Sequence, residues 1–306
     1  MSVHARADRL QGGVRLSDGR QLRWDSLGSA QGAPLVLPGG CYFLHDLEAL
    51  AGRHRRLIAY DLRNRGASDT ESESAVRARG IAQDVDDLEE LRQALQLPTM
   101  DLLTHSYMGH IAAHYAVRQP QRTHRIVLLS PSPPDPGARP PPTPPDTTAT
   151  RILADLSHWR STARQQGATD PVEACRSFWR ILRPLYVADE RHAARIDWGR
   201  CELANERAFL QYFTADVAPS MEREPLTAAR LATVRSPLLI VHGREDRSAP
   251  FAGAQQWQAS WPVEAQLLAL DRVGHAPWIE AAEPVIPAIE RFLGESPPDC
   301  TLLPRP

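Results

Sequence analysis

Short apolar runs bounded by turn residues recur in the first and last thirds of the chain. Six of them cover residues 34–37, 56–60, 100–103, 125–129, 237–241 and 265–270. Continuous apolar segments of this kind are typical of strands in a parallel sheet that is buried on both faces. Residues 81–95 and 285–293 instead place apolar side chains at three- and four-residue spacing, which predicts amphipathic helices. Alternating strands and helices predict a doubly wound, mostly parallel α/β sheet.

Two further strands are predicted near the start, where residues 14–16 and 21–24 flank Ser17-Asp18-Gly19-Arg20. Asp-Gly between two such segments is a strong hairpin signal. We therefore expect an antiparallel edge to the sheet.

The alternation breaks between residues 130 and 237. The break opens with a proline-dense segment, 131–145, which suits neither a helix interior nor a central strand. Helix-like stretches rich in Trp and Phe follow at 148–165, 171–186 and 191–216. This predicts a helical cap over 131–234, inserted into an α/β core formed by 1–130 and 235–306.

The amino-acid composition limits the kinds of partner and chemistry that we expect for this chain. The 306 residues carry a formal net charge of -2, so no strong field favours nucleic acid or an acidic membrane, and we expect a small, neutral or apolar ligand. All 35 basic residues are arginine, which excludes Schiff-base lysine chemistry and a Walker-type phosphate lysine. No apolar leader or membrane-spanning run is evident, which favours a cytoplasmic protein. We expect a monomer or homodimer.

The cysteines are few and scattered. Cys41, Cys175, Cys201 and Cys300 form no C-x-x-C pair, so we expect free thiols and no zinc site. His110 and His114 share one helix face but lack the glutamate of His-Glu-x-x-His, which favours packing over metal binding. We expect no metal and no cofactor.

Candidate chemistry begins at Ser106. Residues 100–110 run from an apolar strand through one serine into a helix, a layout typical of a nucleophile elbow. Such enzymes place an acid and then a histidine downstream, and Asp246 and His275 each follow a late strand. An imidazole oriented by a carboxylate can remove the proton of a serine hydroxyl near neutral pH.

Five motifs in this order resemble the α/β-hydrolase superfamily, and within it the capped group that includes prolyl aminopeptidases and small-substrate esterases. They are Leu37-Pro38-Gly39-Gly40, residues 60–69, the Ser106 elbow, residues 243–250 and residues 274–280. The resemblance covers nearly the whole chain and implies an oxyanion hole formed by the backbone N–H groups of Gly40 and Tyr107. The charges of residues 61–69 are expected to hold a turn.

The chain departs from the family pattern around the nucleophile. Thr104 and Met108 replace the glycines of Gly-x-Ser-x-Gly, and Pro38 replaces the usual histidine of the oxyanion loop. Small residues at these positions normally let the helix and the strand pack tightly around the strained turn, so we expect the Met108 side chain to crowd that contact. Glu245 and Asp135 are rival acids, but Asp246 stands four residues before Pro250, as in the family.

The resemblance also suggests substrate-binding residues. In prolyl aminopeptidases, cap glutamates hold the free amino group of the substrate, which makes Glu202 and Glu206 candidates for the same role. The alternative is that both lie on a solvated helix face. Cys41 is a third candidate. The favoured function is a serine hydrolase that cleaves a small to medium, mainly apolar ester, lactone or amide through an acyl-enzyme. The alternatives are a prolyl aminopeptidase, a natural-product cyclase or transferase, and a non-catalytic small-molecule receptor.

Overall fold

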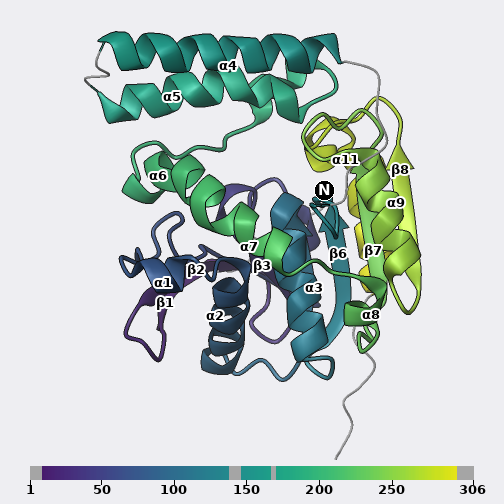
Figure 1. Ribbon diagram of the computed structural model, residues 1–306. Helices are drawn as coiled ribbons and strands as arrows, with labels where there is room; N and C mark the ends of the chain where they lie inside the picture. Colours follow the sequence, from purple (N-terminus) through teal and green to yellow (C-terminus); the bar gives the residue numbers. More distant parts are fainter. Residues whose placement is uncertain (1–8, 138–145, 167–169, 295–306) are drawn as a thin grey trace, which may run out of the picture.

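An eight-stranded sheet forms the centre of the protein in its computed structural model, which describes residues 9–137, 146–166 and 170–294 (Figure 1). The strand order is β1-β2-β4-β3-β5-β6-β7-β8. β1 (Arg9–Arg15) pairs antiparallel with β2 (Gln21–Leu27), which confirms the predicted hairpin, and β2 pairs antiparallel with β4. The remaining neighbours are parallel.

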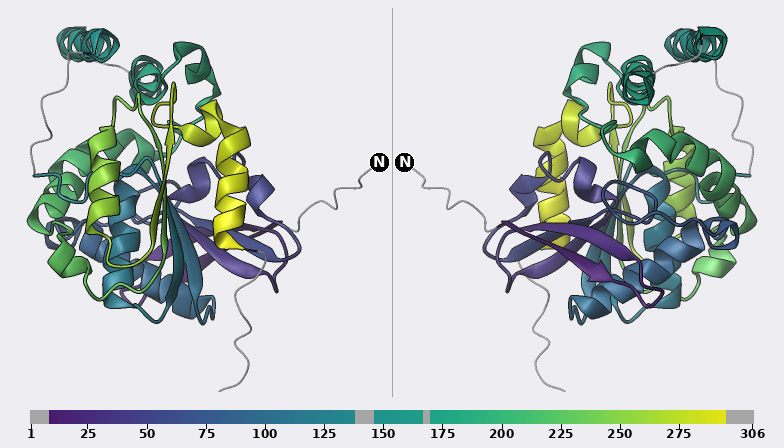
Figure 2. Two further views of the ribbon diagram at one scale, coloured as in Figure 1. Left: turned by 90° about the vertical axis from the view of Figure 1, so that its right-hand side faces the viewer. Right: turned by 90° about the vertical axis from the view of Figure 1, so that its left-hand side faces the viewer.

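The buried apolar runs form the parallel strands. They are β3 (Ala33–Pro38), β4 (Arg55–Tyr60), β5 (Met100–His105), β6 (Thr123–Leu129), β7 (Leu238–Gly243) and β8 (Ala265–Leu270). Helices cover both faces, which explains the continuous apolar runs within these strands. α2 (Ile81–Ala94), α3 (Gly109–Arg118) and α9 (Phe251–Ser260) lie on one face, and α11 (Ala282–Leu293) lies on the other (Figure 2). The predicted α/β-hydrolase fold is confirmed.

Shorter helices complete this part of the chain. They are η1 (Gly40–Tyr42), η2 (Glu48–Leu50), α1 (Ser74–Arg77), η3 (Ser106–Met108) and α10 (Pro277–Glu280). Among the described residues, no helix is both long enough and apolar enough to cross a bilayer.

The segment between β6 and β7 is helical where the structure describes it. It contains α4 (Thr147–Gln166), α5 (Pro171–Leu182), η4 (Arg183–Tyr186), η5 (Glu190–Arg195), α6 (Ala204–Tyr212), the π-helix η6 (Phe213–Val217), α7 (Ala218–Arg223) and α8 (Ala228–Leu231). α4 and α5 lie side by side above the core (Figure 1). We use "cap" below for residues 146–223. Of the predicted proline-rich segment, residues 138–145 lie outside the described part of the chain.

One predicted helical stretch of the cap is interrupted. Residues 196–203 form no helix between η5 and α6. Gly199 has a φ of 82°, and a Cβ there would overlap the Trp179 ring. A left-handed backbone packed against an indole accounts for the break, since only glycine adopts it without strain.

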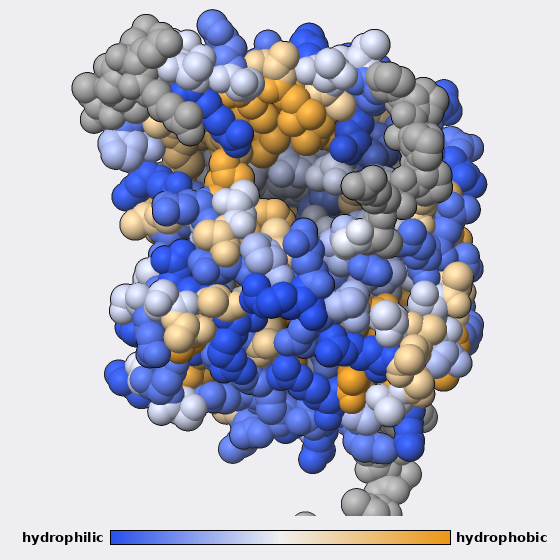
Figure 3. Space-filling view, in the orientation of Figure 1, coloured by the Kyte–Doolittle hydropathy of each residue, from blue (hydrophilic) through white to orange (hydrophobic). Residues whose placement is uncertain are grey.

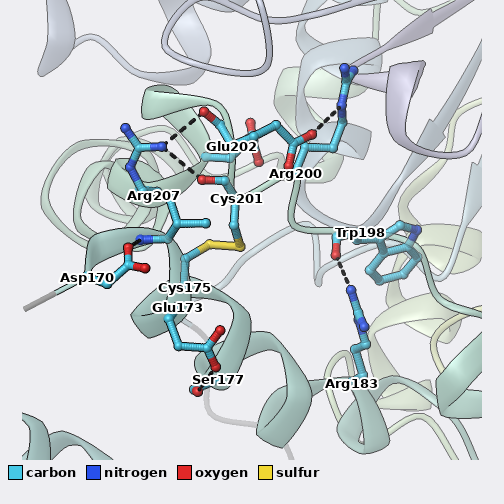
Figure 4. The surroundings of a disulfide bond; sticks show 12 residues. Asp170, Glu173, Cys175, Ser177, Arg183, Trp198, Arg200, Cys201, Glu202 and Arg207 are labelled. Carbon is cyan, nitrogen blue, oxygen red and sulfur yellow. Dashed lines mark hydrogen bonds and ion pairs between the residues drawn. A yellow bond between two sulfur atoms is a disulfide. The ribbon is translucent and has the colours of Figure 1, made fainter. Parts of the chain in front are cut away.

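A disulfide joins α5 to this interrupted segment. Cys175 and Cys201 are bonded, with their Cα atoms 5.7 Å apart, so the prediction of free thiols is wrong for this pair (Figure 4). Their separation of 26 residues carries no motif, and only the folded cap brings the two sulfurs together. Cys300 and the side chain of Cys41 lie outside the described residues.

Breaking this disulfide is expected to destabilise the cap. A cross-link over 26 residues contributes about 3.5 kcal/mol in the chain-entropy description. We expect dithiothreitol, or the double substitution of Cys175 and Cys201 by serine, to lower the urea midpoint followed by tryptophan fluorescence. As a control, dithiothreitol added to the double variant should change nothing further. An unchanged midpoint in both cases would contradict the assigned role.

His110 on α3 predicts a pH-dependent stability. Its Nε2 lies 2.9 Å from the carbonyl oxygen of Pro133, and burial lowers its pKa to about 4. The unfolded chain therefore binds a proton first, so stability falls as the pH drops from about 6.5 towards 4, by about 3 kcal/mol for a shift of this size. The substitution His110→Gln should flatten this decline in unfolding free energy, whereas His54→Gln, at an exposed site, should leave it unchanged. Equal slopes in wild type and His110→Gln would refute the assignment.

Candidate active site

Ser106 occupies a sharp turn between β5 and α3. Its φ is 59°, in the left-handed region that residues with a side chain seldom adopt. The strand ends at His105, and the 3-10 turn Ser106–Met108 leads directly into the helix. Ser106 is half-buried between two buried neighbours. This strained strand-to-helix turn is the geometry of a nucleophile elbow.

The methionine of the altered elbow packs against the loop after β3. A Cβ on Gly39 would overlap the sulfur of Met108, and Gly39 has a φ of 64°. The delayed glycine, Gly109, lies closely over β6, because a Cβ there would come within 3.4 Å of Leu128. Met108 thus points away from the helix–strand contact, and the expected crowding is absorbed by Gly39.

Gly40 and Tyr107 each lie in the first turn of a short 3-10 helix, and the two helices are different. Gly40 opens η1, and Tyr107 is the second residue of η3. The first N–H groups of a helix have no intrahelical partner and are free to meet an anion. Tyr107 lines the same pocket as Ser106.

Asp246 and His275 are brought together by the loops after β7 and β8. Asp246 Oδ2 lies 2.7 Å from His275 Nδ1, and both residues are buried. Asp246 Oδ1 accepts the backbone N–H groups of Ser248 and Ala249, each at 2.8 Å. A carboxylate at Nδ1 makes that nitrogen the donor and leaves Nε2 with the lone pair of a base.

The charge of Asp246 is retained despite its burial. Burial acts to raise the pKa of Asp246, but His275 and His242 together hold it well below its usual range. His242 Nε2 lies 3.3 Å from Asp246 Oδ2 and 2.9 Å from the carbonyl oxygen of Ala249. An ionised carboxylate at this position stabilises an imidazolium.

The rival acids serve other groups. Glu245 Oε2 accepts the N–H of Val273 at 3.2 Å, and Asp135 Oδ1 accepts the N–H of Gly137 at 3.1 Å. Of the three candidates, Asp246 is the one whose hydrogen bond to His275 is present within the described residues.

The backbone around His275 is fastened to both the sheet and the cap. The N–H of His275 donates to the carbonyl oxygen of Tyr186 in η4 at 3.0 Å, and the two rings lie 5.3 Å apart. His105 Nε2 lies 3.0 Å from the carbonyl oxygen of His275. Burial and the neighbouring His275 lower the pKa of His105 well below its usual range, so its ring is neutral. Its Nε2–H is therefore a donor.

Ser106 and His275 line one pocket of about 660 Å³ between the cap and the core. Within the described residues the Ser106 hydroxyl makes no hydrogen bond to the imidazole. Such contacts are often long in an enzyme without substrate and tighten when it binds.

The pocket walls are mainly apolar and come largely from the cap. They include Leu153, Leu156, Trp159, Phe178, Leu182, Phe209, Leu210 and Phe213. Figure 3 shows apolar surface beneath α4 and α5, above a hollow. A concave apolar pocket with few polar groups is typical of a small-molecule site.

The two candidate glutamates of the cap are in different surroundings. Glu202 is exposed, lies 3.6 Å from Arg200 and lines a separate cavity against β1 and β2. Glu206 is buried and lines the pocket of Ser106, where its Oε1 lies 3.1 Å from Arg65 Nε and accepts the N–H of Gly66 at 2.7 Å. Burial acts to raise the pKa of Glu206, but Arg65 holds it below its usual range.

Arg65 belongs to the loop whose charges were predicted only to hold a turn. Asp61 does so, because its Oδ2 accepts the N–H of Ala67 at 2.8 Å, and Arg63 pairs with Asp87. Arg65 instead lines the pocket beside Glu206. The sequence gives no sign of this difference between two arginines in one loop.

His110 and His114 show no metal-site geometry. The described residues contain no group of three His, Cys, Asp or Glu side chains placed to hold a metal ion. The two rings lie 6.4 Å apart beneath the elbow, and burial lowers the pKa of each to about 4.

Known proteins that resemble this chain include hydrolases matched over most of its length. A 2-hydroxymuconate semialdehyde hydrolase from Pseudomonas putida is 27% identical over 243 residues, 79% of this chain and 78% of its own. The structure of an esterase from Exiguobacterium antarcticum superposes with a TM-score of 0.67 at 18% identity, covering 93% of this chain and 99% of that one. At this identity the superposition bears on the fold alone.

Other similarities are partial. A proline iminopeptidase from Heyndrickxia coagulans is 34% identical over 101 residues, 32% of this chain and 34% of its own. The match to 1-acylglycerol-3-phosphate O-acyltransferases from Oryza sativa subsp. japonica and Arabidopsis thaliana spans only 22% and 28% of those proteins.

The family assignment rests on a match that covers most of the chain. Residues 35–288 match the alpha/beta hydrolase family, a range that begins within β3 and includes β4 to β8, the Ser106 turn and the Asp246–His275 pair. The chain therefore belongs to the alpha/beta hydrolase family.

Proposed function

We propose that this protein is a serine hydrolase that cleaves an ester, lactone or amide bond of a small to medium, mainly apolar substrate. The observation that carries the proposal is the buried Asp246–His275 hydrogen bond of 2.7 Å at a pocket that Ser106 also lines, from a turn with a φ of 59°. The resemblance to hydrolases over most of the chain supports it.

In the proposed reaction, His275 Nε2 takes the proton of Ser106 Oγ while that oxygen attacks the carbonyl carbon. The electron pair of the C=O bond moves to oxygen, and the N–H groups of Tyr107 and Gly40 stabilise the oxyanion. As the tetrahedral intermediate collapses, the imidazolium gives its proton to the leaving group. Water then attacks the acyl-enzyme with His275 again as base, which releases the acid and restores Ser106.

Asp246 keeps the imidazole in the required tautomer and balances its transient charge. The apolar walls exclude water and receive the carbon skeleton of the substrate. No cofactor takes part in this scheme, and the partner is the substrate alone.

The surroundings of Glu206 weigh against a prolyl aminopeptidase. That activity needs a carboxylate free to bind an ammonium group, whereas Glu206 is already paired with Arg65 and Glu202 faces another cavity. A transferase or a receptor has no observation in its favour that a hydrolase lacks.

The test combines labelling with turnover. Wild-type protein should react with a fluorophosphonate at Ser106, as mapped by peptide mass spectrometry, and hydrolyse p-nitrophenyl butyrate. Proline p-nitroanilide should not be turned over. A protein that neither reacts nor hydrolyses any member of an ester, lactone and anilide panel would contradict the proposal.

A further inference from the structure

The guanidinium of Arg65 lies at the junction of three segments. Nη1 donates to the Tyr107 hydroxyl at 2.6 Å, and Nε lies 3.1 Å from both the Tyr42 hydroxyl and Glu206 Oε1. The Phe209 ring centroid is 3.6 Å from the guanidinium carbon. Arg65 is only 6% exposed, so these contacts are shielded from solvent.

Two of these partners come from the segments that carry the proposed oxyanion donors. Tyr107 follows Ser106 and offers its own backbone N–H, while its phenol is held by Arg65. Tyr42 ends the 3-10 turn that Gly40 begins. One planar cation thus holds a side chain from each half of the proposed oxyanion hole, and its rigid fork of donors suits such a task.

The third partner belongs to the cap. Glu206 lies in the first turn of α6, and it also accepts the N–H of Gly66. Its neighbour Asn205 donates from Nδ2 to the carbonyl oxygen of Ser68 at 2.8 Å. The loop that presents Arg65 is therefore docked on α6 through two side chains.

The groups of this cluster keep the same protonation states near neutral pH. Burial would lower the pKa of Arg65, but Tyr107, Tyr42 and Glu206 raise it well above its usual range. Burial also raises the pKa of Tyr107 to about 12, so the phenol stays protonated. Glu206 neutralises Arg65, and without it a buried cation would lack its counter-ion.

We infer that Arg65 is a positioning residue that sets the oxyanion donors of Tyr107 and Gly40 through the phenols of Tyr107 and Tyr42, and couples them to docking of the cap through Glu206. The inference rests on the proposed hydrolase function. Small errors in donor placement matter because an oxyanion hole works by preorganisation.

The test separates positioning from a merely structural role. Tyr107→Phe removes the phenol that Arg65 holds but keeps the backbone N–H and the ring. Arg65→Lys keeps the charge but cannot reach three partners with a planar fork. We expect each to lower kcat for p-nitrophenyl butyrate by about 10- to 100-fold, less than full loss of an oxyanion donor, with KM changed less than about threefold.

Arg63 provides the matched control. It is a second buried arginine of the same loop, and it pairs with Asp87 and Glu71, away from both oxyanion segments. Arg63→Lys should lower the melting temperature and leave kcat near the wild-type value. A kcat that follows melting temperature equally in Arg63→Lys and Arg65→Lys would overturn the inference.

Coupling to the cap is read from a double-mutant cycle of Tyr107→Phe with Glu206→Gln. The two side chains share Arg65 as partner, so their effects on kcat should be non-additive. Additive effects, or wild-type kcat in Tyr107→Phe, would overturn the inference while wild-type turnover stands. Absence of wild-type turnover and of Ser106 labelling would instead contradict the proposed function, and the inference with it.

Discussion

Replacing Ser106 by alanine is expected to lower kcat for ester hydrolysis by about a million-fold, the loss typical when the nucleophile of such a triad is removed. The change deletes one oxygen from a half-buried site, so the fold should remain. The substrate should still bind, because the apolar walls come from other residues. The measurement is p-nitrophenyl butyrate turnover, with circular dichroism to check folding.

Ser132 gives the control for the choice of nucleophile, since it lines the same pocket. Fluorophosphonate labelling should disappear in Ser106→Ala and persist in Ser132→Ala. The reverse pattern, or labelling retained in Ser106→Ala, would show that another residue is the nucleophile.

The second large effect is expected for Asp246→Asn, with kcat lower by about ten-thousand-fold. An amide of the same shape can keep the contacts with the N–H groups of Ser248 and Ala249. The amide cannot hold His275 Nδ1 as the hydrogen-bond donor, and it cannot balance the positive charge of an imidazolium. Because the pKa of Asp246 lies well below its usual range, the carboxylate is charged throughout pH 5 to 8, and the loss should be similar across that interval.

The matched control is Glu245→Gln, which changes the adjacent and exposed carboxylate. Its kcat should stay within a few-fold of wild type. If Glu245→Gln and Asp246→Asn lost activity equally, Asp246 would not be the acid that orients His275.

The sequence predicted the sheet well because each buried parallel strand contains a short apolar run that a hydrophobic pattern detects. All eight strands were predicted, and the hairpin expected at the Asp-Gly turn is confirmed. β1 begins earlier than predicted, at Arg9, because its first residues pair through polar groups such as Arg9 with Asp25, which a hydrophobic pattern cannot register.

Part of the candidate site could be predicted because its residues stand at fixed points in the order of strands and helices. Ser106, Asp246 and His275 follow the ends of β5, β7 and β8, and the carboxyl ends of parallel strands meet at one edge. The cap was less predictable. The Cys175–Cys201 bond and the pairing of Arg65 with Glu206 join residues that only a folded cap brings together, and neither leaves a periodic trace.

The contact between Met108 and Gly39 has a consequence for finding related enzymes. A thioether here fills the space above a left-handed glycine, so the departure at Met108 is accommodated by Gly39, which belongs to the loop after the first buried strand. A search that demands glycine at both positions flanking the serine would discard such chains. A search for methionine after the nucleophile together with paired glycines at the end of the first buried strand would retrieve them.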